Sequence, residues 1–195
     1  STMPDDLRKE KNYYAVGGCG GNIAWHTEND VMEIADKPNL ERDIKVYAAS
    51  VIELSNCKYL PFNWLASTKE FREVLNNYQK KSESHFDLSD AIKSLDDFEN
   101  KLKKFYDLIN QDNIEPTKAN KIIKKLARIL IPLNYARNPR FTHDPAVPIP
   151  QIPVLSLCEE FNEIPKEDHG FVKNQLVRGQ NRVIDALDQA SVLLE

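Results

Sequence analysis

Residues 25–30 (Trp-His-Thr-Glu-Asn-Asp) hold the side chains in this chain best suited to metal chemistry. A neutral imidazole such as that of His26 is a good zinc ligand, and a nearby carboxylate such as that of Asp30 could orient the ring. The segment follows a short apolar stretch, and α/β folds place ligand groups at the carboxyl ends of strands. One histidine is not a site by itself, because a catalytic zinc ion needs about three protein ligands. His26 is therefore a candidate metal ligand, with a hydrogen-bonded structural role as the alternative.

A glycine cluster lies just before this segment. Residues 16–22 read Val-Gly-Gly-Cys-Gly-Gly-Asn, which has neither the spacing of a dinucleotide-binding loop nor the Lys-Ser/Thr pair of a phosphate loop. Glycines grouped in this way are typical of a tight turn that needs positive φ angles. The pattern predicts a strand at 13–16, a glycine loop, and a short extended segment at 23–25.

Composition excludes several classes of protein. The 195 residues are 41% hydrophobic and 29% charged, which is typical of a globular protein. A net charge of -4 argues against a dedicated nucleic-acid binder, and no apolar run approaches the ~20 residues of a membrane span. Three cysteines cannot all pair within one chain, and no Asn-x-Ser/Thr acceptor occurs, so we expect reduced thiols and a cytoplasmic location.

Apolar residues recur at helical spacing in five stretches, each of which predicts an amphipathic helix. Prolines, candidate caps and breaks in the pattern place the ends of these helices. The expected helices are residues 39–56 with Asn39 as the cap, residues 68–81, residues 88–109 with Ser89 as a candidate N-cap near the start, residues 116–130 beginning with Pro116, and residues 167–194.

Seven prolines lie between Pro132 and Pro165, and proline removes a backbone donor. We therefore expect an extended crossover on the surface of the helices there. The predicted fold is mainly α, with a bundle of four long helices in residues 64–195. Residues 1–63 have too few elements for a core of their own and are expected to be the tail end of an α/β domain.

Three short stretches together resemble a known enzyme family. They are residues 20–30 (Gly-Gly-Asn-Ile-Ala-Trp-His-Thr-Glu-Asn-Asp), residues 39–47 (Asn-Leu-Glu-Arg-Asp-Ile-Lys-Val-Tyr) and residues 60–62 (Leu-Pro-Phe). They resemble the end of the peptidase domain of the co-catalytic zinc exopeptidases, in the branch that contains glutamate carboxypeptidase and the transferrin receptor. In that branch a helical dimerisation domain follows such a Leu-Pro-Phe segment, and residues 64–195 resemble this transferrin-receptor-like domain throughout.

The resemblance implies a role for only a few residues. His26 matches the last histidine of the family's two-zinc centre and is implied to bind zinc in the full-length parent. Asn22, Trp25 and Asp30 would lie beside this ligand or the substrate. No His-x-Asp or Glu-Glu motif precedes His26, so the family's general base and bridging aspartate do not accompany it. The chain alone is therefore expected to be inactive and to hold no zinc.

Two functions follow from the resemblance. The chain could be the C-terminal part of a zinc-dependent exopeptidase that acts on peptides, supplying one metal ligand and a homodimerisation bundle. Alternatively it could belong to a non-catalytic, receptor-like relative whose bundle serves only assembly or partner binding. The presence of His26 favours the first. Trp25 stands where glutamate-selective members have tyrosine, so aminopeptidase and carboxypeptidase activity both stay open.

Assembly has a separate argument from the residues. Some apolar side chains, such as Ile129, Val177 and Val192, fall outside the helical stripes that one bundle interior would bury. Exposed apolar patches mark interfaces, so we expect a homodimer through residues 64–195. The basic residues of 118–128 could indicate a nucleic-acid module, but their spacing places them on the solvated face of a helix, and we expect no nucleic-acid partner.

Overall fold

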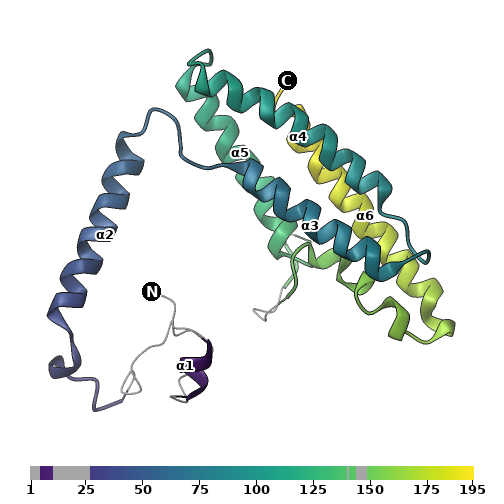
Figure 1. The fold of residues 1–195 in the computed structure, drawn as a ribbon, viewed down its shortest axis with the longest axis horizontal. Coiled ribbons are helices and arrows are strands. Elements are labelled where there is room, and N and C mark those ends of the chain that lie inside the picture. The colour runs from purple at the N-terminus through teal and green to yellow at the C-terminus, as the bar shows by residue number, and fades with distance from the viewer. Residues whose placement is uncertain (1–4, 11–26, 140, 144–148) are drawn as a thin grey trace. The chain divides into compact units, whose positions relative to one another are not determined.

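The computed structural model describes residues 5–10, 27–139, 141–143 and 149–195 (Figure 1). The chain divides into two units, Ser1–Asn56 and Cys57–Glu195. Within the described residues every regular element is helical. The expected strand at 13–16, the glycine loop and the extended segment at 23–25 lie outside the described residues, so the α/β character of residues 1–63 stays a prediction. The elements are α1 (Asp5–Glu10), η1 (Met32–Ile34), α2 (Lys37–Asn56), α3 (Trp64–Ser82), α4 (Ser89–Asn110), α5 (Pro116–Tyr135), η2 (Pro153–Cys158), η3 (Phe161–Glu163), η4 (Lys166–Asp168) and α6 (His169–Val192).

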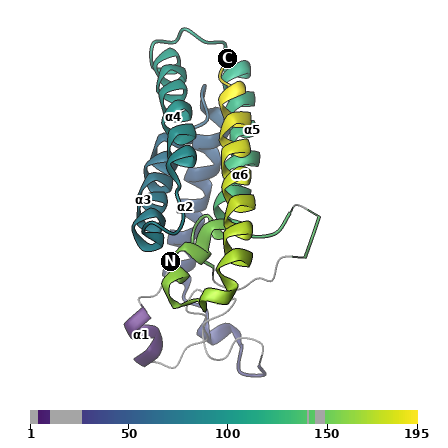
Figure 2. The same cartoon turned by 90° about the vertical axis from the view of Figure 1, so that its right-hand side faces the viewer.

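The second unit is the predicted helical bundle. Helix α4 packs against α3 on one side and α6 on the other, and α6 also packs against α5 (Figures 1 and 2). The 3-10 helix η2 contacts α3, α5 and α6, so it is part of the bundle rather than a connection that runs over it. The fold class expected from the apolar periodicity is confirmed for this unit.

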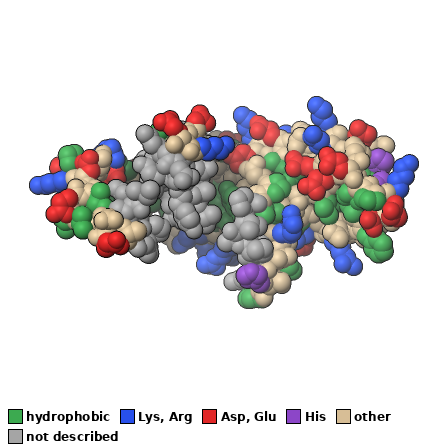
Figure 3. All heavy atoms as spheres, turned by 90° about the horizontal axis from the view of Figure 1, so that it is seen from below, with side chains coloured by type: hydrophobic (Ala, Val, Ile, Leu, Met, Phe, Trp, Pro, Cys, Tyr) green, Lys and Arg blue, Asp and Glu red, His purple; other side chains and the backbone are tan. Residues whose placement is uncertain are grey.

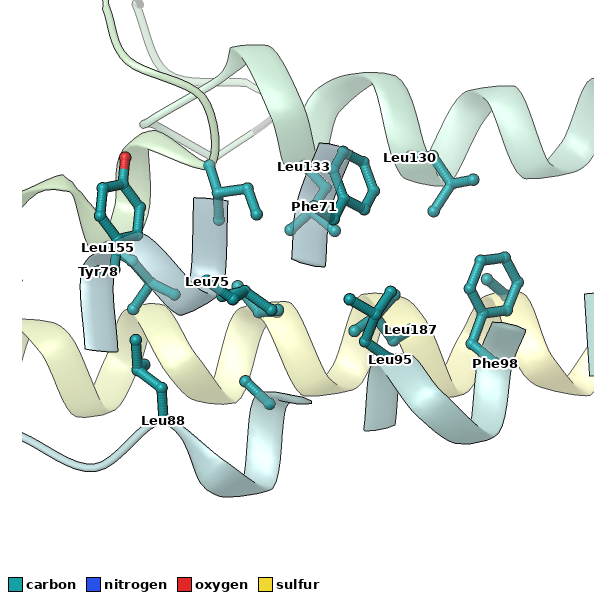
Figure 4. Packing of buried hydrophobic residues seen from close by; sticks show 14 of the residues in the cluster. Phe71, Leu75, Tyr78, Leu88, Leu95, Phe98, Leu130, Leu133, Leu155 and Leu187 are labelled. Carbon is teal, nitrogen blue, oxygen red and sulfur yellow. The ribbon is translucent and has the colours of Figure 1, made fainter. Parts of the chain in front are cut away.

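Apolar stripes on the four helices meet in one core. Leu95, Phe98 and Leu102 follow one another at helical spacing on α4, and each is fully buried. Burying a leucine or phenylalanine side chain contributes about 1.5–3 kcal/mol, so this stripe anchors the bundle. Figure 4 shows the interior into which Leu95 and Phe98 point, lined also by Phe71, Leu75 and Tyr78 of α3, Leu130 and Leu133 of α5, Leu155 of η2, and Leu187 of α6.

Side chains at the helix starts fix where three of the helices begin. Asn63 accepts a hydrogen bond from Leu65 N at the start of α3. Glu115 accepts hydrogen bonds from the first free N–H groups of α5, in which Pro116 is the first residue as predicted. The predicted N-cap of α4 is wrong: Ser89 is the first residue of the helix, and Leu88 is its N-cap. The Asp87 carboxylate accepts hydrogen bonds from both the N–H and the hydroxyl of Ser89. These bonds also lower the pKa of the Asp87 carboxyl.

The proline-rich crossover differs from the prediction. Its second half is a series of 3-10 helices, and Ile152, Leu155, Cys158 and Phe161 are fully buried in the bundle core. Ile152 has a φ of 47°, a left-handed conformation that is rare for a β-branched residue. Proline excludes an α-helix here, but it does not prevent the single turns of 3-10 helix that bring these apolar side chains inward.

The first unit contains one long helix in its described part. Helix α2 begins at Lys37, and Asp36 accepts the Asn39 N–H, so the predicted cap Asn39 lies inside the helix. The apolar stripe of α2 is exposed to solvent: the exposed fractions of Ile44, Tyr47 and Val51 are 58%, 75% and 62%. None of the described residues of this unit is buried, as expected of a segment without a core of its own.

Candidate functional site

The candidate metal ligand and its neighbours are only partly described. Asn22, Trp25 and His26 lie outside the described residues, so nothing in the structure tests whether they come together. Asp30 is exposed, in a turn whose backbone is closed by a hydrogen bond from Asp30 N to Thr27 O. Asn29 N also donates to the Thr27 hydroxyl, so this turn has a defined local geometry.

Elsewhere the described residues contain no group of three or more histidine, cysteine or carboxylate side chains arranged to hold a metal ion. The buried thiol of Cys158 is also unsuited to that role, since burial raises its pKa to about 12 and keeps it protonated. Among the described helices, none is both long and apolar enough to cross a bilayer.

The segment between α2 and α3 is tied to the bundle by polar contacts. Tyr59 Oη lies 2.6 Å from Asp112 Oδ1 and 2.8 Å from the carbonyl oxygen of Ile114, in the loop between α4 and α5. Lys58 pairs with the same carboxylate. The hydrogen bond to Asp112 raises the pKa of Tyr59 to about 12, and the contacts from Lys58 and Tyr59 lower the pKa of Asp112. The contacts of Lys58 and Tyr59 therefore hold this segment in one orientation on the bundle.

The Leu-Pro-Phe segment that carries part of the resemblance lies in the same set of contacts. Leu60 N donates to Asn120 Oδ1 at 2.8 Å, and Tyr106 Oη donates to the carbonyl of Phe62 at 2.5 Å. Trp64 then donates its indole N–H to the carbonyl of Ile123. Residues 58–64 are therefore docked on α4 and α5 and belong structurally to the bundle.

Two histidines to which the sequence assigns no role pack together at one end of the bundle. The ring of His85 stacks on Phe161 with a centroid distance of 5.1 Å, and His169 lies 4.7 Å from the same phenylalanine. His169 Nε2 is 3.0 Å from the carbonyl of Ile164. The cluster joins the turn after α3 to η3 and the start of α6. These contacts indicate that the two histidines pack this end of the bundle.

An acidic groove of about 530 Å³ lies beside α3, between it and the segment around residues 150–159. Glu70, Glu73 and Glu159 line it, and none of the three has a described Lys, Arg or His side chain within 4 Å. Tyr78 and Gln151 also line the groove, and the Tyr78 hydroxyl donates a hydrogen bond to the carbonyl of Gln151 at 2.6 Å. Sequence reasoning missed this groove because its acidic residues come from segments about 90 positions apart.

Exposed apolar side chains remain on the bundle, as the sequence predicts. On α6, Val177 is 46% exposed and Val192 is 64% exposed, with the half-buried Ile184 between them on the same side of the helix. Ile129 of α5 is half-buried. These three apolar residues of α6 form a strip, the α6 strip, that a partner could cover.

The basic residues of α5 lie in solvent. Lys118, Lys121, Lys124, Lys125 and Arg128 are all exposed, as the amphipathic pattern predicts. On the face drawn in Figure 3, basic and acidic side chains of the described residues are intermingled. This distribution is that of an ordinary solvated surface.

Comparison with known proteins adds no relative to this description: no protein family, curated protein or solved structure matches the chain.

Proposed function

We propose that the chain is the C-terminal part of a zinc-dependent exopeptidase, in which residues 1–56 complete a peptidase domain and supply His26 as one zinc ligand. Residues 57–195, with the Leu-Pro-Phe segment docked on the helices, would be its homodimerisation bundle. The substrate would be a peptide, and the parent would hold two zinc ions. The proposal rests first on the resemblance of residues 20–30, 39–47 and 60–62 to that family.

The observation that carries the proposal furthest is the uncovered face of α2. A 20-residue helix with an exposed stripe of Ile44, Tyr47 and Val51 needs an apolar surface to pack on. An α/β peptidase sheet would provide such a surface, because helices cover both faces of that kind of sheet. The bundle, by contrast, has a complete core of its own. This contrast supports assigning the two parts to different domains.

Metal analysis of the 195-residue chain tests the proposal that this chain supplies only one of the zinc ligands. We expect less than about 0.1 zinc per chain after dialysis and no hydrolysis of aminoacyl or peptidyl substrates, because one imidazole cannot hold a catalytic zinc ion. Stoichiometric zinc that survives dialysis, together with peptide hydrolysis, would show that the chain contains a full site and contradict the proposed division.

Light scattering tests the dimerisation role. Residues 57–195, which hold a core of their own, should form a two-fold dimer at tens of micromolar. A stable pairing of this kind buries at least ~1,000 Å² in total. We expect Val177→Glu to raise the dimer dissociation constant at least about tenfold, because two-fold symmetry brings two carboxylates into one apolar interface.

Leu108→Glu is the matched control, since it places the same charge on a similarly exposed apolar side chain (42%) of a different helix, α4. It should leave the dissociation constant unchanged. If the wild-type protein were a monomer at about 50–100 μM, or if both substitutions had equal effects, the α6 strip would not be the dimerisation element.

A further inference from the structure

Three arginines line a cavity of about 450 Å³ on the bundle surface. The cavity lies where the end of α5, the helix η2 and the middle of α6 meet. Arg137 comes from the segment just after α5, and Arg178 and Arg182 are one turn apart on α6, on the same side of the helix. The cavity is separate from residues 20–30 in the sequence, and nothing in the proposed peptidase function uses it.

Two of the three guanidinium groups are held in place by the protein. Arg182 donates to the carbonyl of Arg137 at 2.7 Å and to the carbonyl of Asn138 at 3.1 Å. Arg137 in turn donates to the Ser156 hydroxyl at 3.1 Å. Each bond uses one N–H, and a guanidinium has five, so both arginines keep donors for a ligand. Their positions are set before any ligand arrives, which lowers the entropic cost of binding.

The positive charge at this cavity has no counterpart in the described part of the chain. Among the described residues, no aspartate or glutamate lines the cavity, and no carboxylate lies within 4 Å of Arg137, Arg178 or Arg182. Arg72 on α3 shows the usual alternative, since it is paired at 2.6 Å with both Asp96 and Glu99. Three like charges around one cavity repel one another, and an anion bound between them would remove that repulsion.

We propose that this cavity binds the phosphate group of a small organic phosphomonoester. A phosphate monoester carries about two negative charges near neutral pH and offers three acceptor oxygens, which suits three guanidinium groups better than a single carboxylate does. A volume of about 450 Å³ lies within the range of small-molecule sites and leaves room for an organic body. Pro153, Val154 and Leu157 supply an apolar wall against which that body can pack.

Isothermal titration calorimetry of the 195-residue chain with phenyl phosphate, inorganic phosphate and benzoate tests the proposal. Phenyl phosphate should bind saturably with a submillimolar dissociation constant, and the other two at least about fivefold more weakly, since each lacks either the apolar ring or the second charge. Absence of saturable phenyl phosphate binding would overturn the site. If inorganic phosphate bound as tightly as phenyl phosphate, the claim that the cavity also binds the organic body would be wrong. If benzoate bound as tightly as phenyl phosphate, the claim of a preference for phosphate would be wrong.

Arg178→Gln is the informative variant, because the Arg178 side chain makes no described bond whose loss would disturb the bundle. It should weaken phenyl phosphate binding at least tenfold while the circular dichroism spectrum and melting temperature stay unchanged. Arg128→Gln on the exposed face of α5 removes the same charge elsewhere and should leave affinity unchanged. If both variants weaken binding equally, or neither does, the phosphate is held by general surface charge and the assignment of this cavity is wrong.

Discussion

Gly179→Ala is expected to destabilise the bundle by about 2 kcal/mol, although alanine is the better helix former. A Cβ atom at position 179 would overlap the backbone carbonyl of Val154 and touch the side chain of Leu155. The carbonyl cannot move away easily, because Ile152 and Leu155, on either side of Pro153 and Val154, are fully buried in the core. Overpacking of this kind costs about 1–3 kcal/mol or more, and the gain of about 1 kcal/mol in helix propensity offsets only part of it.

Gly170→Ala on the same helix is the matched control. Nothing lies within 4 Å of a Cβ atom at that position, so alanine should stabilise the chain by up to about 1 kcal/mol. Thermal and urea unfolding of residues 57–195 measure both variants. For a chain of this size, about 2 kcal/mol corresponds to a fall of roughly 4–8 °C in melting temperature. Equal effects of the two substitutions would contradict the close contact between α6 and η2.

The sequence predicts the helices well because burial repeats along them every three or four residues. The spacing of Leu95, Phe98 and Leu102 predicts α4 even when the residues that they pack against are not known, and Pro116 marks the first residue of α5. The helix starts are less certain, since neighbouring polar residues compete for the same cap. At α4, Asp87 and Ser89 could each accept a free N–H, and only the backbone direction shows that Asp87 does so.

The burial of the crossover and the arginine cavity could not be predicted from the sequence, for a different reason. Proline content predicts what the crossover cannot be, but it gives no period from which the burial of Leu155 or Phe161 could be derived. Arg178 and Arg182 are visible as a pair at helical spacing. Arg137 joins them only because α5 and α6 pack together, and no local pattern encodes that contact over some 40 residues of chain.

The metal-ligand hypothesis makes the largest functional prediction. In the complete peptidase that the proposed function implies, His26→Ala should lower zinc content and reduce turnover by more than about 100-fold. Even the loss of a group that only orients a metal ligand costs 10–100-fold, and a direct ligand contributes more. Stability should change little in comparison, because the substitution removes one imidazole and no part of the bundle core.

His143→Ala in the same protein is the matched control for that substitution. His143 is exposed, and its backbone carbonyl accepts a hydrogen bond from Asn138 Nδ2, which the change to alanine leaves in place. Zinc measured by atomic absorption and kcat with a peptide substrate should therefore be normal in this variant. A His26→Ala protein with full zinc occupancy and normal kcat would exclude His26 as a ligand. Loss of zinc with unchanged melting of the bundle would instead agree with a metal site confined to the first unit, since the core of residues 57–195 includes none of that unit's described residues.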